Sequence, residues 1–110
     1  MISFAQKVWA AASRIPRGRV ATYKDVSRAA GRPRAWRAAA NALNKNPFIP
    51  LVPCHRVVGA DGRLRGYAGG IKKKIKLLES EGVIIKRRRL ELRKYRFGFK
   101  TGNKRPLSGR

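Results

Sequence analysis

The chain has 110 residues, of which 43% are hydrophobic, and this is enough for one modest core in one compact domain. Its 28 Lys and Arg residues against 5 Asp and Glu give a formal net charge of +23, which indicates a polyanionic partner such as nucleic acid. A single cysteine excludes an internal disulfide, and one cysteine with one histidine makes a conventional zinc site implausible.

Other classes of protein also fit the sequence poorly. The longest apolar runs are too short to span a bilayer, so we expect no membrane partner. The N-terminus lacks the basic-then-apolar order of a secretion signal. Glutamate is too scarce for the ion-pair networks that would otherwise account for so many basic residues. We therefore expect an intracellular protein in a reducing setting.

The first predicted helix is amphipathic and follows Ser3, a residue type that favours the N-cap position. The turn residues Pro16 and Gly18 end this region, and residues 20–23 are extended in character. Thr22 is placed to cap a second helix, and Gly31 fits the position just after its end.

A third helix is predicted from Pro33, which suits a first helical turn, to Leu43. Two short helices joined by a turn that contains Gly31 are typical of a helix-turn-helix. The expected fold class is therefore mainly α with short extended segments. The third helix has small residues that allow close approach by a partner or close packing on another helix, namely Ala35, Ala38 and Ala39.

The segment IPLVPCHRVVG, residues 49–59, holds the only cysteine, Cys54, beside the only histidine, His55. A free thiol is mostly protonated at neutral pH and needs a base or a positive field to act as a nucleophile. Neighbours on a strand point to opposite faces, but a tight turn at Pro53 would bring the two side chains together. An acid such as Glu79 or Glu81 would then orient the imidazole. A buried apolar cysteine is the structural alternative, and its polar neighbours disfavour it.

The last predicted helix begins after a glycine-rich loop, and we expect it to place four lysines outward: Lys72, Lys73, Lys74 and Lys76. We assign residues 1–85 to one domain and residues 86–110 to a basic C-terminal extension, whose single acid is Glu91. Alternating residues predict a strand near 89–99, followed by disorder. The extension adds nonspecific DNA affinity, contacts a partner or is simply solvated.

The stretch PCHRVV, Pro53–Val58, resembles the active-site motif of the O6-alkylguanine-DNA alkyltransferases, also called methylated-DNA–protein-cysteine methyltransferases. Further stretches match in the family's order and spacing: IPRG at 15–18, GRP at 31–33, NP at 46–47, GYAGG at 66–70 and LLESEG at 77–82. The resemblance covers residues 3–83 and the family's C-terminal active-site and DNA-binding domain only. The extension departs from this pattern, as does Ala68, where many members have serine.

The resemblance implies a winged-helix-like helix-turn-helix domain that binds duplex DNA with a damaged base, as a monomer, without a cofactor or metal. Cys54 would accept the alkyl group from a flipped O6-alkylguanine. His55 would act as a base through a water, and Glu81 would orient it. Tyr67 would donate to the leaving guanine, and Asn46 would brace the active-site turn.

The resemblance also implies the residues that contact DNA. Arg37 would take the place of the extruded base in the minor groove, and Tyr23 would act on the 3′ phosphate and the flipped base. The remaining predicted DNA contacts are Arg34, Ala35, Ala38 and Arg56. Such a reaction requires flipping because the reacting atom is buried in the base stack, and basic residues would add phosphate contacts.

Other functions fit the same residues. One is a damage sensor like the alkyltransferase-like proteins, which often carry tryptophan in place of the cysteine, so the presence of Cys54 argues against it. Another is a Cys54-dependent enzyme for a different damaged base. A thiol hydrolase using Cys54 and His55 is disfavoured by the predicted helix-turn-helix and the +23 charge.

Overall fold

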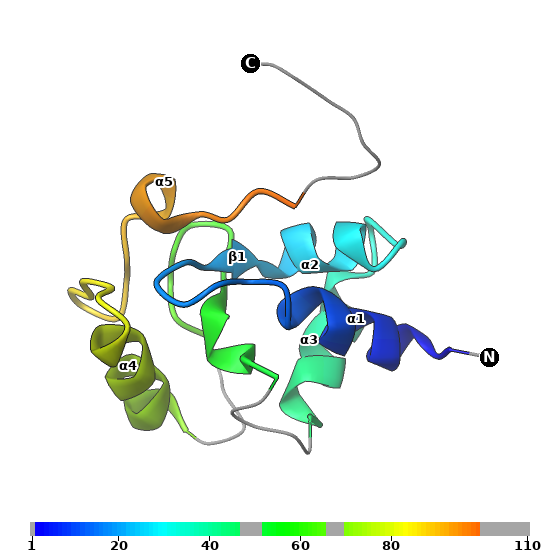
Figure 1. Cartoon of the computed structure of the whole chain (residues 1–110), viewed down its shortest axis with the longest axis horizontal. Coiled ribbons are helices and arrows are strands. Elements are labelled where there is room, and N and C mark those ends of the chain that lie inside the picture. Colours follow the sequence, from blue (N-terminus) through cyan, green and yellow to red (C-terminus); the bar gives the residue numbers. More distant parts are fainter. Residues whose placement is uncertain (1, 47–51, 66–69, 100–110) are drawn as a thin grey trace.

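The computed structural model describes residues 2–46, 52–65 and 70–99. Its elements in chain order are α1 (Phe4–Ala12), β1 (Ala21–Thr22), α2 (Tyr23–Ala29), α3 (Trp36–Asn44), the 3₁₀ turn η1 (Cys54–Arg56), β2 (Val57–Val58), α4 (Ile71–Ser80) and α5 (Leu92–Tyr95). Helices α1 to α3 group on one side, α4 lies on the other, and the short strands and η1 lie between them (Figure 1). The predicted mainly helical fold is confirmed, and α2 with α3 forms the helix-turn-helix.

Both predicted N-caps are confirmed, and each forms a capping box. The Ser3 hydroxyl accepts from the Gln6 amide at 3.1 Å, while the Gln6 side chain accepts from the Ser3 amide at 2.9 Å. Thr22 and Asp25 make the same reciprocal pair at 3.0 and 3.1 Å. Gly31 follows α2 with a φ of 92°, a backbone conformation that a residue with a Cβ rarely adopts. These local contacts set where α1 and α2 begin and where α2 ends.

Helix α3 begins later than the sequence predicted. Pro33 and Arg34 lie in a turn, and the Ala35 amide donates to the Arg32 carbonyl at 3.0 Å, so helical hydrogen bonding starts from Trp36. Ala39 is fully buried in the core, which is the packing role left open for the small residues of this helix. The turn therefore places Trp36 and Arg37 at the start of α3.

A short parallel pair of strands holds the centre of the domain. Ala21 lies opposite Val57 and Thr22 opposite Val58, and all four residues are buried. This pairing fixes η1, which directly precedes β2, next to the start of α2. Helices α1 and α3 are joined by a hydrogen bond of 2.8 Å from the Trp9 indole to the Ala42 carbonyl. Within the described residues, no helix is long and apolar enough to cross a membrane.

The strand predicted near residues 89–99 is wrong for most of its length, because Leu92–Tyr95 forms the helical turn α5. The alternating pattern misled because Leu92 and Tyr95 are also three residues apart, a spacing that puts both on one helical face. Extended pairing in this stretch is found at Arg89, which bridges to Arg63 and Lys86, and again at the end of α5. At the end of α5 the Val20 amide donates to the Tyr95 carbonyl at 2.9 Å, and the Phe97 amide donates to the Val20 carbonyl at 2.7 Å.

Residues 86–99 of the predicted extension pack onto the rest of the domain. Leu90 and Tyr95 are buried in one cluster with Val20 and Leu78, which come from the other side of the assigned boundary at residue 85. The segment runs over β1 and α2 in Figure 1. The expected disorder falls in residues 101–110, which lie outside the described residues.

Candidate active site

Cys54 opens the 3₁₀ turn η1 and is buried against α3. The Asn46 side-chain amide donates to Cys54 Sγ at 2.9 Å and to the Val52 carbonyl at 3.1 Å. The thiol itself donates to the Leu43 carbonyl at 3.3 Å. Burial raises the pKa of Cys54 above its ordinary value, while the Asn46 hydrogen bond and the charge of Lys74 lower it in opposition. The resting thiol is therefore protonated at neutral pH, with two groups placed to stabilise its anion.

His55 forms the centre of a buried polar group. Its Nε2 lies 3.0 Å from Glu81 Oε2, and Arg56 donates to both carboxylate oxygens of Glu81, at 2.9 Å from Nε and 2.7 Å from a terminal nitrogen. Burial lowers the pKa of His55, against the opposing effect of Glu81. Burial would raise the pKa of Glu81, but hydrogen bonds from Arg56 and His55 lower it below its ordinary value. The site thus holds a neutral imidazole oriented by an ionised carboxylate.

The 3₁₀ turn explains how two adjacent residues, Cys54 and His55, can belong to one site. The helical path of Cys54–Arg56 lets all three side chains of the triplet face the interior, in contrast to the alternating faces of a strand. Glu81, at the end of α4, reaches them as predicted, whereas Glu79 is exposed.

Lys74 was predicted to point outward, and this prediction is wrong. Its side chain has 0% exposure, and its ammonium donates to the Val57 carbonyl at 2.7 Å and the Arg65 carbonyl at 3.2 Å. Burial lowers the pKa of Lys74 to about 7, and Cys54 raises it in opposition. Lys74 therefore contributes a positive charge that favours the thiolate when its amine is protonated. The sequence carries a signal for this burial, because Lys74 lies four residues before Leu78 and so shares the buried face of α4.

A cavity of about 580 Å³ opens next to Tyr23, between α3 and the loop after β2. The described residues that line it are Tyr23, Lys24, Trp36, Ala40, Asn44, Gly59, Ala60 and Arg65. Tyr23 links the cavity to the thiol, because it packs on the same core cluster as Cys54 and lies 5.9 Å from the Lys74 ammonium. Burial raises the pKa of Tyr23 to about 12, so its hydroxyl stays protonated and can donate.

Four of the six residues predicted to contact DNA lie along α3 and the turn before it. Arg34, Arg37 and Ala38 are exposed, and Ala35 is half-buried at the N-cap of the helix. Sequence reasoning missed Trp36, which is 38% exposed and lies under the Arg37 guanidinium, 5.2 Å from the ring centroid. The exposed start of α3 therefore presents an aromatic ring and cations to solvent.

Arg56 occupies a different place from the one predicted. Besides its two bonds to Glu81, its guanidinium donates to the Ile15 carbonyl at 2.8 Å. Because this guanidinium is used inside the protein, we reassign Arg56 from DNA contact to holding the carboxylate. Tyr67 and Ala68 lie outside the described residues. The structure brings four of the predicted catalytic residues into two hydrogen-bonded pairs, Asn46 with Cys54 and Glu81 with His55.

Residues 3–83 match the family model described as 6-O-methylguanine DNA methyltransferase, DNA binding domain. The chain belongs to this family. It is 47% identical over 78 residues to a methylated-DNA–protein-cysteine methyltransferase of Methanosarcina barkeri. The aligned part covers 71% of this chain and 49% of the relative. The chain thus spans about half the length of the curated relatives it matches.

Solved structures of the family give two kinds of match. Mycobacterium tuberculosis OGT in complex with DNA aligns with a TM-score of 0.71 and 45% identity, over 74% of this chain and 50% of that chain. S. pombe Atl1, in complex with damaged DNA containing O6-carboxymethylguanine, aligns with a TM-score of 0.79 and 31% identity. That second match covers 88% of this chain and 98% of Atl1. Because it covers more of the chain than the family model, this match extends beyond the methyltransferase domain.

Proposed function

We propose that this protein repairs duplex DNA by transferring the alkyl group of an O6-alkylated guanine to Cys54. The thiolate sulfur attacks the alkyl carbon, the S–C bond forms, and the bond from that carbon to O6 breaks with its electron pair going to the guanine. The guanine regains a proton, and the stable thioether ends the reaction after one turnover. The observation that carries the proposal is a buried thiol, hydrogen-bonded by Asn46 and influenced by the charge of Lys74, in a core cluster that Tyr23 joins to a cavity at α3.

The chain's own groups have separable roles in this reaction. Asn46 and Lys74 stabilise the thiolate, and His55, oriented by Glu81, takes the thiol proton through a water. Tyr23 lies where a flipped base would enter. Arg37, with Arg34, Ala35 and Ala38, would meet the minor groove, and Arg37 would fill the space left by the base. Tyr67 stays a prediction as the donor to the leaving guanine. The protein is expected to act as an intracellular monomer without a cofactor.

A second function is favoured by one observation. The match to Atl1 has a TM-score of 0.79 over 88% of this chain, against 0.71 over 74% of it for Mycobacterium tuberculosis OGT. A damage sensor would bind the lesion tightly and leave the alkyl group in place. A Cys54-dependent reaction on a different damaged base stays a third possibility.

Intact-protein mass distinguishes these functions. The protein is mixed with duplex DNA that carries one O6-methylguanine, beside unmodified duplex and a Cys54→Ser variant. Transfer predicts a gain of one methyl group on the native protein only. Lesion-selective binding of the native protein with no gain in mass would contradict transfer and support the sensor. Loss of both selectivity and mass gain would contradict both.

A further inference from the structure

The chain between α4 and α5 forms a tight turn with an unusual sequence. Lys86 and Arg89 exchange two backbone hydrogen bonds, at 2.9 and 3.0 Å, so Arg87 and Arg88 are the two central residues of a hairpin. Their φ angles are 54° and 59°. Two-residue hairpin turns with positive φ at both centres favour Asn-Gly, because side chains with a Cβ are disfavoured in this region. The sequence has Arg-Arg instead, so two charged side chains occupy backbone positions that do not favour them.

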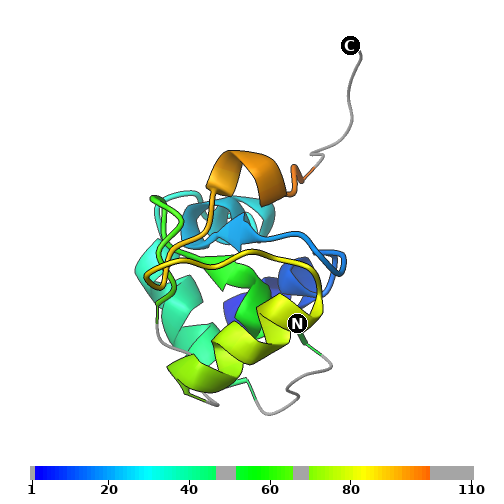
Figure 2. The same ribbon diagram turned by 90° about the vertical axis from the view of Figure 1, so that its left-hand side faces the viewer.

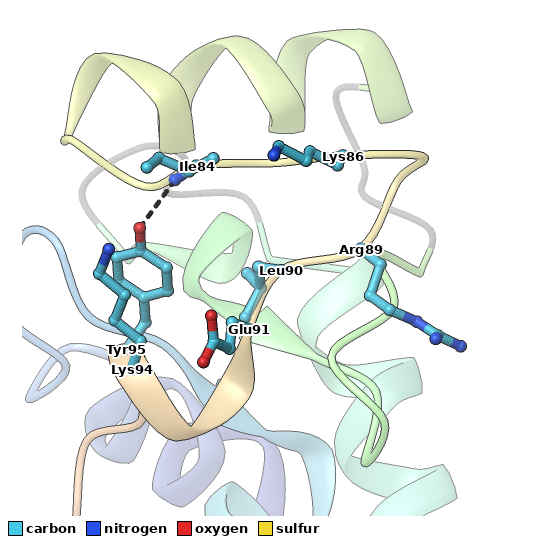
Figure 3. A pocket seen from close by; sticks show the side chains of 7 residues that line it. All are labelled: Ile84, Lys86, Arg89, Leu90, Glu91, Lys94 and Tyr95. Atoms are coloured by element: carbon cyan, nitrogen blue, oxygen red, sulfur yellow. Dashed lines mark hydrogen bonds between the residues drawn. The ribbon is translucent and has the colours of Figure 1, made fainter.

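The side chains of the two arginines have no polar partner within the described part of the protein. Both are exposed, and among the described residues no hydrogen bond or ion pair is formed by either side chain. Local strain of this kind is found preferentially where a site needs a particular side chain. In the view of Figure 3, Lys86 and Arg89 mark the two arms of the turn, and the Arg89 side chain points away from the body of the protein.

The turn is fixed to the loop that borders the candidate active site. The Leu64 amide donates to the Arg88 carbonyl at 2.8 Å, and the Leu90 amide donates to the Gly62 carbonyl at 3.0 Å. A hollow of about 500 Å³ lies where the turn meets this loop. It is lined by Leu64 and six cations: Arg63, Arg65, Lys86, Arg87, Arg88 and Arg89. Arg65 also lines the cavity beside Tyr23 and Trp36. Cations thus continue from the reaction site to the tip of the turn.

Negative charge is sparse along this basic turn. Among the described residues, Asp61 is the carboxylate that pairs with these cations, at 3.3 Å from Arg63 and 3.9 Å from Arg89, and all three side chains are well exposed. One carboxylate cannot balance six cations. Guanidinium groups match the geometry of phosphate oxygens, so a phosphate backbone fits this surface better than a neutral partner does.

We propose that residues 86–89 form a basic arm that grips the DNA phosphate backbone next to the damaged nucleotide, in addition to the contacts of α3. This inference rests on the proposed function, because it assumes that DNA lies along α3 and over the cavity beside Tyr23. The turn lies toward the same edge as α3 in Figure 2 and on the side of α4 in Figure 1, and Arg65 connects it to the cavity at α3. The arm has the position of a wing next to a helix-turn-helix, and its strained turn aims Arg87 and Arg88 outward.

The turn geometry supplies a variant that removes charge without loss of fold. Arg87→Asn with Arg88→Gly installs the residues that this turn favours, so the double variant is expected to be at least as stable as the native protein. A matched control removes two charges from the exposed face of α4, which lines neither cavity, by Lys72→Gln with Lys76→Gln. Binding to a short duplex with one O6-methylguanine is measured from about 0.05 to 0.5 M salt.

Each phosphate contact contributes about 0.9 to the slope of log K against log salt. Loss of two contacts therefore lowers the slope by about 2 and weakens binding at about 0.1 M salt by tens of fold, while the control changes binding by much less. The arm variant should still transfer its methyl group at saturating DNA and low salt. Equal slopes for native and arm variant, or equal losses in arm and control variants, would overturn the proposal. If the native protein neither binds nor accepts the methyl group, the proposed function itself fails.

Discussion

Replacing Asn46 by Ala removes the hydrogen bond that the structure gives to the Cys54 sulfur at 2.9 Å. A hydrogen bond to a charged group contributes about 1.5–3 kcal/mol, and sulfur, a weak acceptor, belongs at the lower end. Because about 1.4 kcal/mol corresponds to one pKa unit, the pKa of Cys54 should rise by about one unit in Asn46→Ala. At neutral pH the thiolate fraction then falls about tenfold.

The same change makes each thiolate more reactive. Nucleophilicity rises with thiol pKa with a Brønsted coefficient of about 0.4–0.5, which gives about a threefold gain for one unit. The net alkylation rate of Cys54 should therefore fall about threefold at neutral pH. Above the pKa of both proteins, where each thiol is fully ionised, Asn46→Ala should react about threefold faster than the native protein. The two pH profiles are expected to cross.

The assay is the pH dependence of Cys54 methylation by iodomethane, followed by intact mass, because a single cysteine makes the site unambiguous. Asn46→Asp is the matched variant: it keeps the shape, cannot donate when ionised, and should raise the pKa further than Ala does. Denaturation in urea reports the separate loss of about 1–3 kcal/mol from the Val52 carbonyl, which also loses its Asn46 donor. An unchanged apparent pKa, or parallel profiles that do not cross, would show that Asn46 is a brace with no effect on the thiolate.

Three further predictions follow from the buried charges. The pKa of Lys74 is about 7 in the fold against 10.5 ordinarily, so the unfolded chain binds more protons between these values and stability from this group rises with pH. Lys74→Met should remove a rise of about 2 kcal/mol between about pH 7 and 9, measured by urea denaturation at both pH values. Glu81→Gln should destabilise the fold by about 3 kcal/mol, because Arg56 keeps a poorly paired charge, and should slow alkyl transfer in single-turnover assays. Arg96→Met should cost about 1 kcal/mol at neutral pH and leave alkyl transfer unchanged. Since Arg96 lowers the pKa of Asp25, that stability difference should shrink as pH falls through the titration of Asp25 in thermal unfolding.

Much of the fold follows from local chemistry that the sequence displays. Ser3 and Thr22 act as N-caps with the partners expected three residues later, and Gly31 takes the positive φ that ends α2. The start of α3 was less accessible to sequence reasoning, because Pro33 fits either a first helical turn or the loop before it. The choice depends on a turn that ties Ala35 back to Arg32.

For the candidate active site, too, the sequence predicted some features and not others. The motif and spacing correctly placed Cys54 next to Asn46, and Glu81 next to His55. The burial of Lys74 was missed because a run of lysines is typical of a solvated face, and only tertiary contacts with two backbone carbonyls hold one of them inside. These contacts join α4 to segments that are distant in sequence, so no local pattern reports them.

The C-terminal segment illustrates a third limit. Its alternating apolar residues fit a strand, but the helical turn of α5 buries Tyr95 and lets its hydroxyl accept a hydrogen bond from the Ile84 amide at 3.1 Å. The charge of Arg96 is likewise explained by the buried Asp25, which lies far away in sequence. Composition alone separated this segment from the domain, whereas packing joins them.

The central claim is that Cys54 is the alkyl acceptor, and the most direct test is a titration. Increasing amounts of duplex DNA with one O6-methylguanine are added to a fixed amount of protein, and the methylated fraction is read from peptide mass at residue 54. Transfer to Cys54 predicts a linear rise that stops at one methyl group per protein, with an equal amount of guanine restored in the DNA. Lesion-selective binding that saturates with no methyl group on Cys54 would contradict it.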